Sequence, residues 1–184
     1  MEELRRGEKN LVMEYLGNGD RLFEAMKKEK IELRSFRFAG GDISFGRCID
    51  DKMMEVLCGM KTLESLRIER GKAFLREGKS LEKAIVNGLK TLEINLELSH
   101  DGNKSFFKFL AQNGEKLKLE TLELSLQKAG DKERGVSSTF VSRSSSLKKL
   151  CLTSENNEKH SFKEVLEGVE KSTFSGRIVD GNRR

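Results

Sequence analysis

A recurring spacing of apolar residues constrains this chain more than any other feature. Residues 61–70 (KTLESLRIER) place Leu63, Leu66 and Ile68 in the pattern L-x-x-L-x-L. The pattern returns at residues 89–94, 119–124 and 147–152, with a softer copy at 33–38. One position per unit keeps a spacing of 28 residues, and its members are Phe38, Leu66, Ile94, Leu122, Leu150 and Ile178. A fixed period of this length predicts a solenoid of stacked units.

Each unit is predicted to contain a helix followed by a strand. The helices are expected at residues 20–29, 50–59, 79–87, 103–112, 137–143 and 160–170, and the strands at 33–38, 63–68, 91–98, 119–126, 147–152 and 174–179. Because a helix-bearing crossover separates each strand from the next, we expect a parallel sheet. A doubly wound sheet buries both faces and reads as continuous apolar runs. Here Glu93, Asn95 and Glu97 alternate with apolar residues, which predicts one face packed on helices and one face in water.

The two ends of the chain carry separate predictions. Leu11, Val12, Tyr15 and Leu16 share one helical face within residues 8–16. We interpret this helix as a cap, because terminal repeats need a polar outer face. The predicted organisation is an N-terminal capping helix at 1–19, a repeat array at 20–179 and a polar basic tail at 180–184. An uncovered last strand would leave an edge through which the chain can associate with another copy.

The units resemble the ribonuclease-inhibitor-like class of leucine-rich-repeat proteins. The resemblance rests on the L-x-x-L-x-L sets and on helices such as MMEVLCGMKTLESL and SFKEVLEGVEKSTF, which lead into the next strand. It covers residues 20–179 and implies a horseshoe of about six repeats, with a parallel concave sheet and convex helices. The family places an asparagine shortly after each strand, whereas Glu-Arg-Gly, Ser-His-Asp, Gln-Lys-Ala and Ser-Glu-Asn stand here. We therefore expect looser turns without an asparagine ladder.

The composition limits the classes of protein to which this chain can belong. The net charge of +5 comes from 35 basic and 30 acidic residues, which interleave along the chain and indicate a solvated surface rather than a nucleic-acid footprint. Cys48, Cys58 and Cys151 form no C-x-x-C pair, so we expect free thiols and a reducing compartment. The start, MEELRRGEKN, has no apolar signal region, and no run is long enough to span a membrane. A soluble cytoplasmic protein is predicted.

No catalytic constellation, metal-ligand spacing or phosphate loop is found in the sequence, so we predict a non-enzyme without cofactor or metal. The His100-Asp101 pair is read as a turn, because adjacent residues cannot hold triad geometry without tertiary help. Phe106 and Phe109 fall at core spacing and leave Phe107 over as a candidate for the surface. The serine-rich stretch at 137–146 is compatible with phosphorylation sites, but a polar crossover is favoured.

The wet face of the sheet is therefore the predicted functional surface. Extended concave surfaces are the binding surfaces of repeat solenoids, so we predict a module that binds a protein partner there. Its side chains are Arg34, Arg37, Glu64, Arg67, Glu93, Asn95, Glu97, Glu120, Glu123, Ser125, Lys148 and Cys151. They are expected to form a basic, an acidic and a second basic block. The alternative, implied by the resemblance alone, is a regulatory repeat protein of the small-GTPase-activator, actin-capping or immune-sensor type.

Overall fold

The strands of the protein follow one another in a single parallel sheet. The computed structural model describes residues 10–13, 19–39, 49–75, 78–98, 100–126, 139–154 and 177–180. Within these residues, seven strands form one sheet, and every neighbouring pair is parallel. Their order in the sheet is their order in the chain, from β1 (Asn10–Met13) to β7 (Arg177–Asp180). The predicted parallel α/β fold is confirmed. A doubly wound sheet reverses its strand order at a switch point, so the sequential order is compatible with a solenoid-like arrangement.

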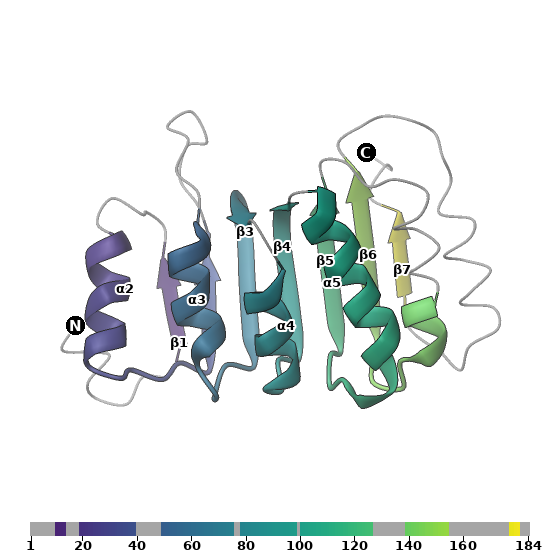
Figure 1. The fold of residues 1–184 in the computed structure, drawn as a ribbon, viewed down its shortest axis with the longest axis horizontal. Coiled ribbons are helices and arrows are strands. Elements are labelled where there is room, and N and C mark those ends of the chain that lie inside the picture. Colours follow the sequence, from purple (N-terminus) through teal and green to yellow (C-terminus); the bar gives the residue numbers. More distant parts are fainter. Residues whose placement is uncertain are drawn as a thin grey trace.

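Helices alternate with the strands and lie on one face of the sheet (Figure 1). The helices are α2 (Gly19–Lys28), α3 (Asp51–Gly59), α4 (Lys79–Val86) and α5 (His100–Asn113), followed by the 3-10 turn η2 (Gly114–Lys116). The inner strands are β2 (Ser35–Phe38), β3 (Ser65–Leu75), β4 (Thr91–Leu98), β5 (Thr121–Leu126) and β6 (Lys149–Ser154). Residues 139–143 are also helical. The helix predicted over 160–170 lies outside the described residues, as do residues 1–9, 14–18 and 181–184 of the predicted cap and tail.

Local signals in the sequence begin and end the helices. The Asp50 carboxylate accepts a hydrogen bond of 2.9 Å from the Met53 amide and caps α3, in agreement with the predicted start of this helix. At the end of α4, Gly88 adopts a φ of +112°, which a residue without Cβ does at little cost. The Leu89 amide then donates to the Ala84 carbonyl at 3.1 Å. The chain thereby passes from helix to strand over the four residues 87–90.

The leucines of the repeated motif form the core. The first leucine of each motif is buried, with at most 5% of its surface exposed. These residues are Leu33, Leu63, Leu89, Leu119 and Leu147. Phe107 is buried as well, at 2% exposure, with its ring 5.9 Å from that of Phe106 in an edge-to-face arrangement. The prediction that Phe107 is left over from the core is therefore wrong, because α5 buries two adjacent rings while Phe109 is only partly buried.

The residues that keep the strict 28-residue spacing do not form a single column of paired positions across the sheet. Phe36 pairs with Leu66 and Phe38 with Ile68, so the successive units are 30, 26, 30, 28 and 28 residues long. Phe38 and Ile94 occupy the last position of the motif, whereas Leu66 and Leu122 occupy the middle one. Each motif has two apolar positions two residues apart. A unit that is two residues longer or shorter therefore still places an apolar residue 28 positions after the previous one.

The predicted N-terminal helix is wrong at residues 10–13. These residues form β1, which pairs in parallel with β2 and places Leu11 beside Phe36 and Met13 beside Phe38. Leu11 and Met13 are partly buried against the core, and Val12 is 59% exposed. Adjacent apolar residues fit a helical face and a strand equally well over so short a stretch. Pairing with β2 decides in favour of the strand.

Hydroxyl groups link neighbouring units at the edge where the strands begin. Most of the turns after the strands, where an asparagine ladder was not expected, lie outside the described residues. The Thr62 hydroxyl donates to the Leu33 carbonyl at 2.8 Å, and the Ser146 hydroxyl lies 2.8 Å from the Leu117 and 2.9 Å from the Leu119 carbonyl oxygen. Both residues stand directly before the first leucine of a motif. Each hydroxyl therefore satisfies carbonyl groups of the preceding unit, at the edge where the strands begin.

Candidate functional site

The candidate site is the face of the sheet opposite the helices, which we call the open face. Side chains alternate along each strand, so Leu66 is buried under the helices while Ser65 and Arg67 on either side of it are half-exposed. No described helix covers this face (Figure 1). The same alternation holds in β2, β4 and β5.

Three rows of side chains cross the open face from strand to strand. The edge row lies where the strands begin and contains Arg34, Glu64, Lys90, Glu120 and Lys148. The hydroxyl row contains Ser35, Ser65, Thr91 and Thr121. The central row contains Arg37, Arg67, Glu93, Glu123 and Cys151. Asn95, Glu97 and Ser125 continue β4 and β5, but their side chains lie outside the described part of the structure. The other nine predicted site residues fall in the edge and central rows.

The edge row alternates in sign and is joined by ion pairs. The Glu64 carboxylate lies 3.3 Å from Arg34 Nη2 and 3.0 Å from Lys90 Nζ. The Lys148 ammonium lies 2.6 Å from Glu120 Oε2. Hydrogen bonds from Lys90 and then Arg34 lower the pKa of the Glu64 carboxyl, and the hydrogen bond from Lys148 lowers that of Glu120. Exposed pairs of this kind contribute little to stability, because water screens the charges.

The central row is paired in the same way. A bulge in β3 places residues 69–72 opposite the single residue Asn95 of β4, and from this bulge Glu69 pairs with Arg37. Both nitrogen–oxygen distances are 2.7 Å, which is the two-pronged geometry of a guanidinium on a carboxylate, and this contact raises the pKa of Arg37. Arg67 Nε lies 3.5 Å from Glu93 Oε2. The Lys149 ammonium lies 2.8 Å from Glu123, and this hydrogen bond raises the pKa of Lys149.

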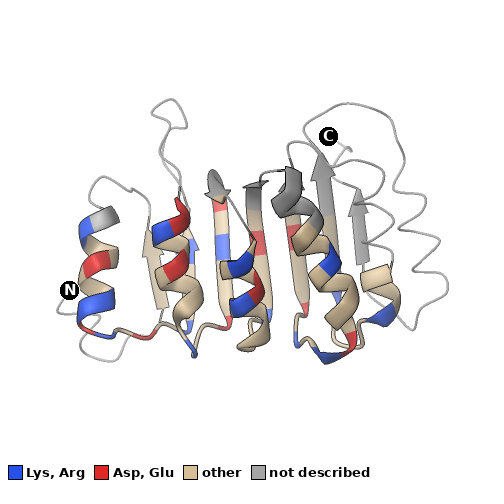
Figure 2. Cartoon of the chain, viewed as in Figure 1, with Lys and Arg blue, Asp and Glu red and all other residues tan. Residues whose placement is uncertain are grey.

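The open face is not divided into a basic, an acidic and a second basic block. Lys90 stands between Glu64 and Glu120, and Lys149 contacts Glu123, so basic groups occupy the predicted acidic middle. Red and blue bands interleave across β3, β4 and β5 in Figure 2. Six basic and five acidic side chains take part in the ion pairs of this face. The face is therefore close to neutral, with opposite charges side by side.

Six residues of the open face escaped the sequence reasoning, namely Ser35, Ser65, Lys90, Thr91, Thr121 and Lys149. A period of two along each strand also turns the position before the middle leucine outward, and this signal identifies the hydroxyl row and Lys149. Within the described residues, none of the four hydroxyls makes a hydrogen bond. The hydroxyl row therefore offers donors and acceptors to a ligand between two rows of paired charges.

Cys151 lies in the central row, as predicted, but it is not exposed. It pairs with Glu123 and Val179 in register, and only 6% of its surface is accessible. A thiol on the wet face was expected to lie at the surface, and this expectation is wrong for Cys151. A position in the central row does not by itself leave a side chain accessible to solvent. Cys151 is therefore a poor contact residue, whereas the side chains of Glu93 and Glu123 are 20% and 42% exposed.

Cys58 is expected to resist thiol reagents while the protein is folded. It is a completely buried residue of α3, and burial raises the pKa of its thiol to about 12 against the opposing charge of Lys83. Because the thiolate is the reactive species, iodoacetamide at pH 8 should leave Cys58 unmodified and should label it fully in denaturant. Peptide mass spectrometry reports the modification of each cysteine. Rapid labelling of Cys58 in the folded protein would contradict the packing of α3.

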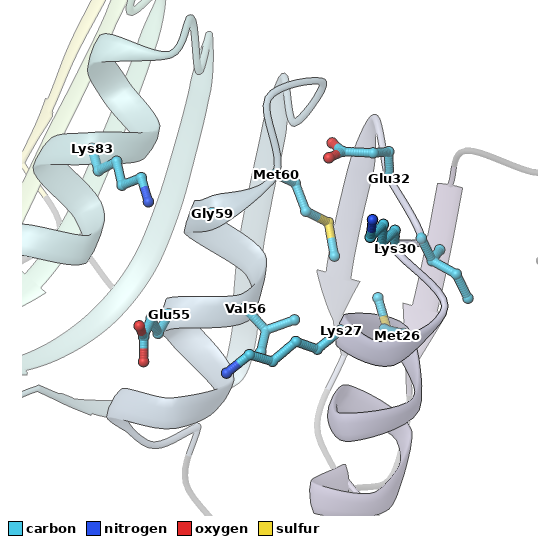
Figure 3. Close-up of a pocket in the computed structure, with 10 residues that line it drawn as sticks. Met26, Lys27, Lys30, Glu32, Glu55, Val56, Gly59, Met60 and Lys83 are labelled. Atoms are coloured by element: carbon cyan, nitrogen blue, oxygen red, sulfur yellow. The ribbon is translucent and has the colours of Figure 1, made fainter.

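A hollow of about 330 Å³ lies on the helix side, between the C-terminal halves of α2 and α3 (Figure 3). The side chains of Met26 and Met60 point into it, and Lys27, Lys30 and Lys83 approach from its rim. Gly59 lines it, and a Cβ atom at Gly59 would meet nothing within 4 Å. The lining residues contain no nucleophile with an adjacent base. This hollow therefore offers packing and charge, not acid–base chemistry.

The described part of the chain was also compared with the requirements of a metal site and of a membrane span. No group of three or more His, Cys, Asp or Glu side chains there could hold a metal ion. None of its helices has the length and apolarity needed to cross a membrane. His100 and Asp101 belong to the first turn of α5 rather than to a turn between elements, so the predicted turn is wrong there.

Comparison with protein-family models, curated proteins and solved structures finds no match for this chain. The fold is therefore argued from the strand register and the burial of the motif residues alone. The strand register and the buried motif leucines follow the repeated apolar spacing of the sequence, with unit lengths that vary between 26 and 30 residues.

Proposed function

We propose that the protein is a non-enzymatic interaction module that binds a protein partner through the open face. We further propose that it is a leucine-rich-repeat array of the ribonuclease-inhibitor-like class, in which this face is concave. The observation that carries the proposal is the in-register display of side chains from β2 to β5 on a face that no described helix covers. Repeat arrays bind their partners with such extended surfaces.

The pairing of the charges bears on how a partner is selected. Opposite charges alternate across the open face, so the field of this face falls off over a short distance. Long-range steering needs a surface dominated by one sign, and we expect little of it here. Selection depends instead on matching each charge and hydroxyl at close range, since a misplaced like charge is costly. The partner surface should accordingly carry interleaved charges and polar groups.

The ion pairs also prepare the surface for binding. Each long side chain of the two charged rows is already held by its neighbour, as with Arg37 on Glu69 at 2.7 Å. Immobilising a free side chain of this kind on binding costs about 0.5–1.5 kcal/mol. Part of that ordering has already occurred in the free protein. The absence of aromatic anchors from the three rows nevertheless predicts a modest affinity.

Arginines at Ser65 and Thr91 are expected to abolish partner binding. Both residues lie in the hydroxyl row between the charged rows, so the double change Ser65→Arg and Thr91→Arg fills the face and keeps every ion-pairing residue. Affinity capture from a lysate of cells that express the protein, followed by mass spectrometry, gives the set of bound proteins. Proteins retained by the wild type should be lost from the variant.

The matched control adds two arginines on the helix side, as Val86→Arg and Gln112→Arg. Val86 is 65% exposed on α4, and Gln112 is exposed on α5. This variant has the same change of charge as the open-face variant and should retain the captured proteins. Equal retention by both variants, or equal loss from both, would contradict binding through the open face.

A further inference from the structure

A basic hollow of about 470 Å³ lies at the edge of the sheet where β2, β3 and β4 begin. It is lined by the basic side chains of Arg34, Lys61, Lys90 and Lys118, and by a single acidic side chain, Glu64. Asn87, Gly88 and the turn at residues 61–63 complete its wall. In Figure 2 these strands begin at the lower edge of the sheet. From this hollow we propose a docking site for a carboxylate-rich, extended segment of a partner protein.

The charge is not balanced among the described residues that line the hollow, and the acidic side chain next to its wall is Glu32, whose carboxylate accepts a hydrogen bond of 3.1 Å from the Thr62 hydroxyl. Glu64 is shared between Arg34 at 3.3 Å and Lys90 at 3.0 Å, so one carboxylate serves two cations. Lys61 and Lys118 have no ion-pair partner among the described residues. Four cations facing one anion leave an excess of three positive charges around an open space. Acidic groups of a ligand would supply the missing counter-charge.

Backbone groups argue against a compact anion such as phosphate. Phosphate sites commonly use a nest of free amides or a helix N-terminus. Here the amides of residues 87–90 all donate to carbonyl groups, at 2.8–3.2 Å. The helix end that reaches the hollow is the C-terminus of α4, which carries a partial negative charge. Anions are therefore attracted by the long side chains around the hollow rather than by its floor.

The spacing of the cations suits an extended peptide. Arg34 and Lys90 belong to units two strands apart, which corresponds to about 10 Å. Alternate side chains of an extended peptide point the same way at intervals of about 6.6 Å, and lysine side chains can span the difference. The side-chain amide of Asn87 makes no hydrogen bond among the described residues and is exposed to a peptide backbone. None of the described residues that line the hollow has an aromatic side chain on which a nucleic-acid base could stack.

The inference rests on the proposed function in one respect, because the acidic segment would belong to the partner. The hollow is nevertheless testable without that partner. A fluorescein-labelled short peptide of alternating glutamate and serine serves as the probe, and fluorescence anisotropy gives its affinity. The peptide should bind the wild type at low salt and more weakly at about 0.15 M salt, where charges are screened beyond about 8 Å.

The double change Lys61→Ala and Lys118→Ala should weaken the probe at least about fivefold, because it removes the two unpaired cations. Lys52→Ala with Lys108→Ala is the matched control, since both lysines are exposed on helices away from the hollow. That control should keep the wild-type affinity, and circular dichroism should show that both variants are folded. If the capture experiment contradicted binding through the open face while the probe peptide still bound the hollow, only the proposed function would be contradicted and the docking site would stand.

Three results would overturn the docking site. The first is a wild type that does not bind the glutamate–serine peptide at low salt. The second is an equal loss of affinity in the Lys52 and Lys108 control. The third is a labelled single-stranded DNA, or inorganic phosphate as a competitor, that occupies the hollow as tightly as the peptide and with the same dependence on Lys61 and Lys118. That outcome would indicate a general anion site instead of an acidic-peptide site.

Discussion

Replacing Leu66 by alanine is expected to lower the free energy of unfolding by about 2–5 kcal/mol. Leu66 is completely buried at the centre of the sheet, in register with Phe36 on one side and Leu92 on the other. Removing its side chain leaves a cavity between three strands and the helices above them. Each unit contacts mainly its neighbours, so a weakened unit also weakens the interfaces on both sides. Denaturant titration followed by circular dichroism measures the change.

The matched control for Leu66→Ala is Val86→Ala. Val86 is an aliphatic residue of α4 with 65% of its surface exposed, so its truncation should change the free energy of unfolding by no more than about 0.5 kcal/mol. The difference between the two variants isolates burial from the loss of aliphatic atoms. Similar effects of the two variants would show that Leu66 does not occupy a packed interior.

Replacing Gly78 by alanine is expected to destabilise the protein by about 1–3 kcal/mol. A Cβ atom at Gly78 would lie 2.9 Å from Phe106 Cβ and 3.1 Å from Phe106 Cδ2. Phe106 is completely buried and contacts the ring of Phe107, so it has little room to move. The backbone at Gly78 has φ −73° and ψ 1°, and steric contact is therefore the source of the loss. Thermal and denaturant unfolding of the variant would measure it.

Gly59→Ala provides the opposite case in the same protein. Gly59 is the last residue of α3, and a Cβ atom there meets nothing within 4 Å. Alanine should stabilise the protein by about 0.4–1 kcal/mol, because it restricts the unfolded chain without a clash. If both glycine variants were more stable than the wild type, the close approach of α5 to Gly78 would be contradicted; if both were less stable, the open space at Gly59 would be contradicted.

The alternation of the motif allowed most of the fold to be predicted. Three apolar residues at spacings of three and two identify a strand with a buried side, and the helix before it is marked by its own apolar face. α3 shows this at its start, where Asp50 caps the helix as its sequence indicates. The length of each repeat unit was harder to assign. Phe38 and Leu66 are both apolar members of a motif, yet they occupy different columns of the sheet. Only pairing between strands distinguishes those two columns.

Apart from Phe107 and the His100-Asp101 pair within α5, the failures concern interactions between residues that are distant in sequence. β1 looks helical on its own, and its strand conformation depends on pairing with β2. The bulge of β3 brings Glu69 onto Arg37 across 32 residues, which no local pattern announces. The alternation along the strands identified the charged residues of the open face. It did not identify the residues with which they form ion pairs. The basic hollow likewise combines Arg34 with Lys118 from different units, so the sequence order conceals it.

The sequential order of the strands has a consequence for how the chain reaches its native state. The strand pairs between β2 and β7 join residues 23–30 positions apart. The entropy cost of closing such a loop depends only weakly on its length, and it is nearly the same at each step. A unit can therefore join the growing sheet as soon as it leaves the ribosome, without waiting for distant parts of the chain. Synthesis and folding can advance together, one strand at a time.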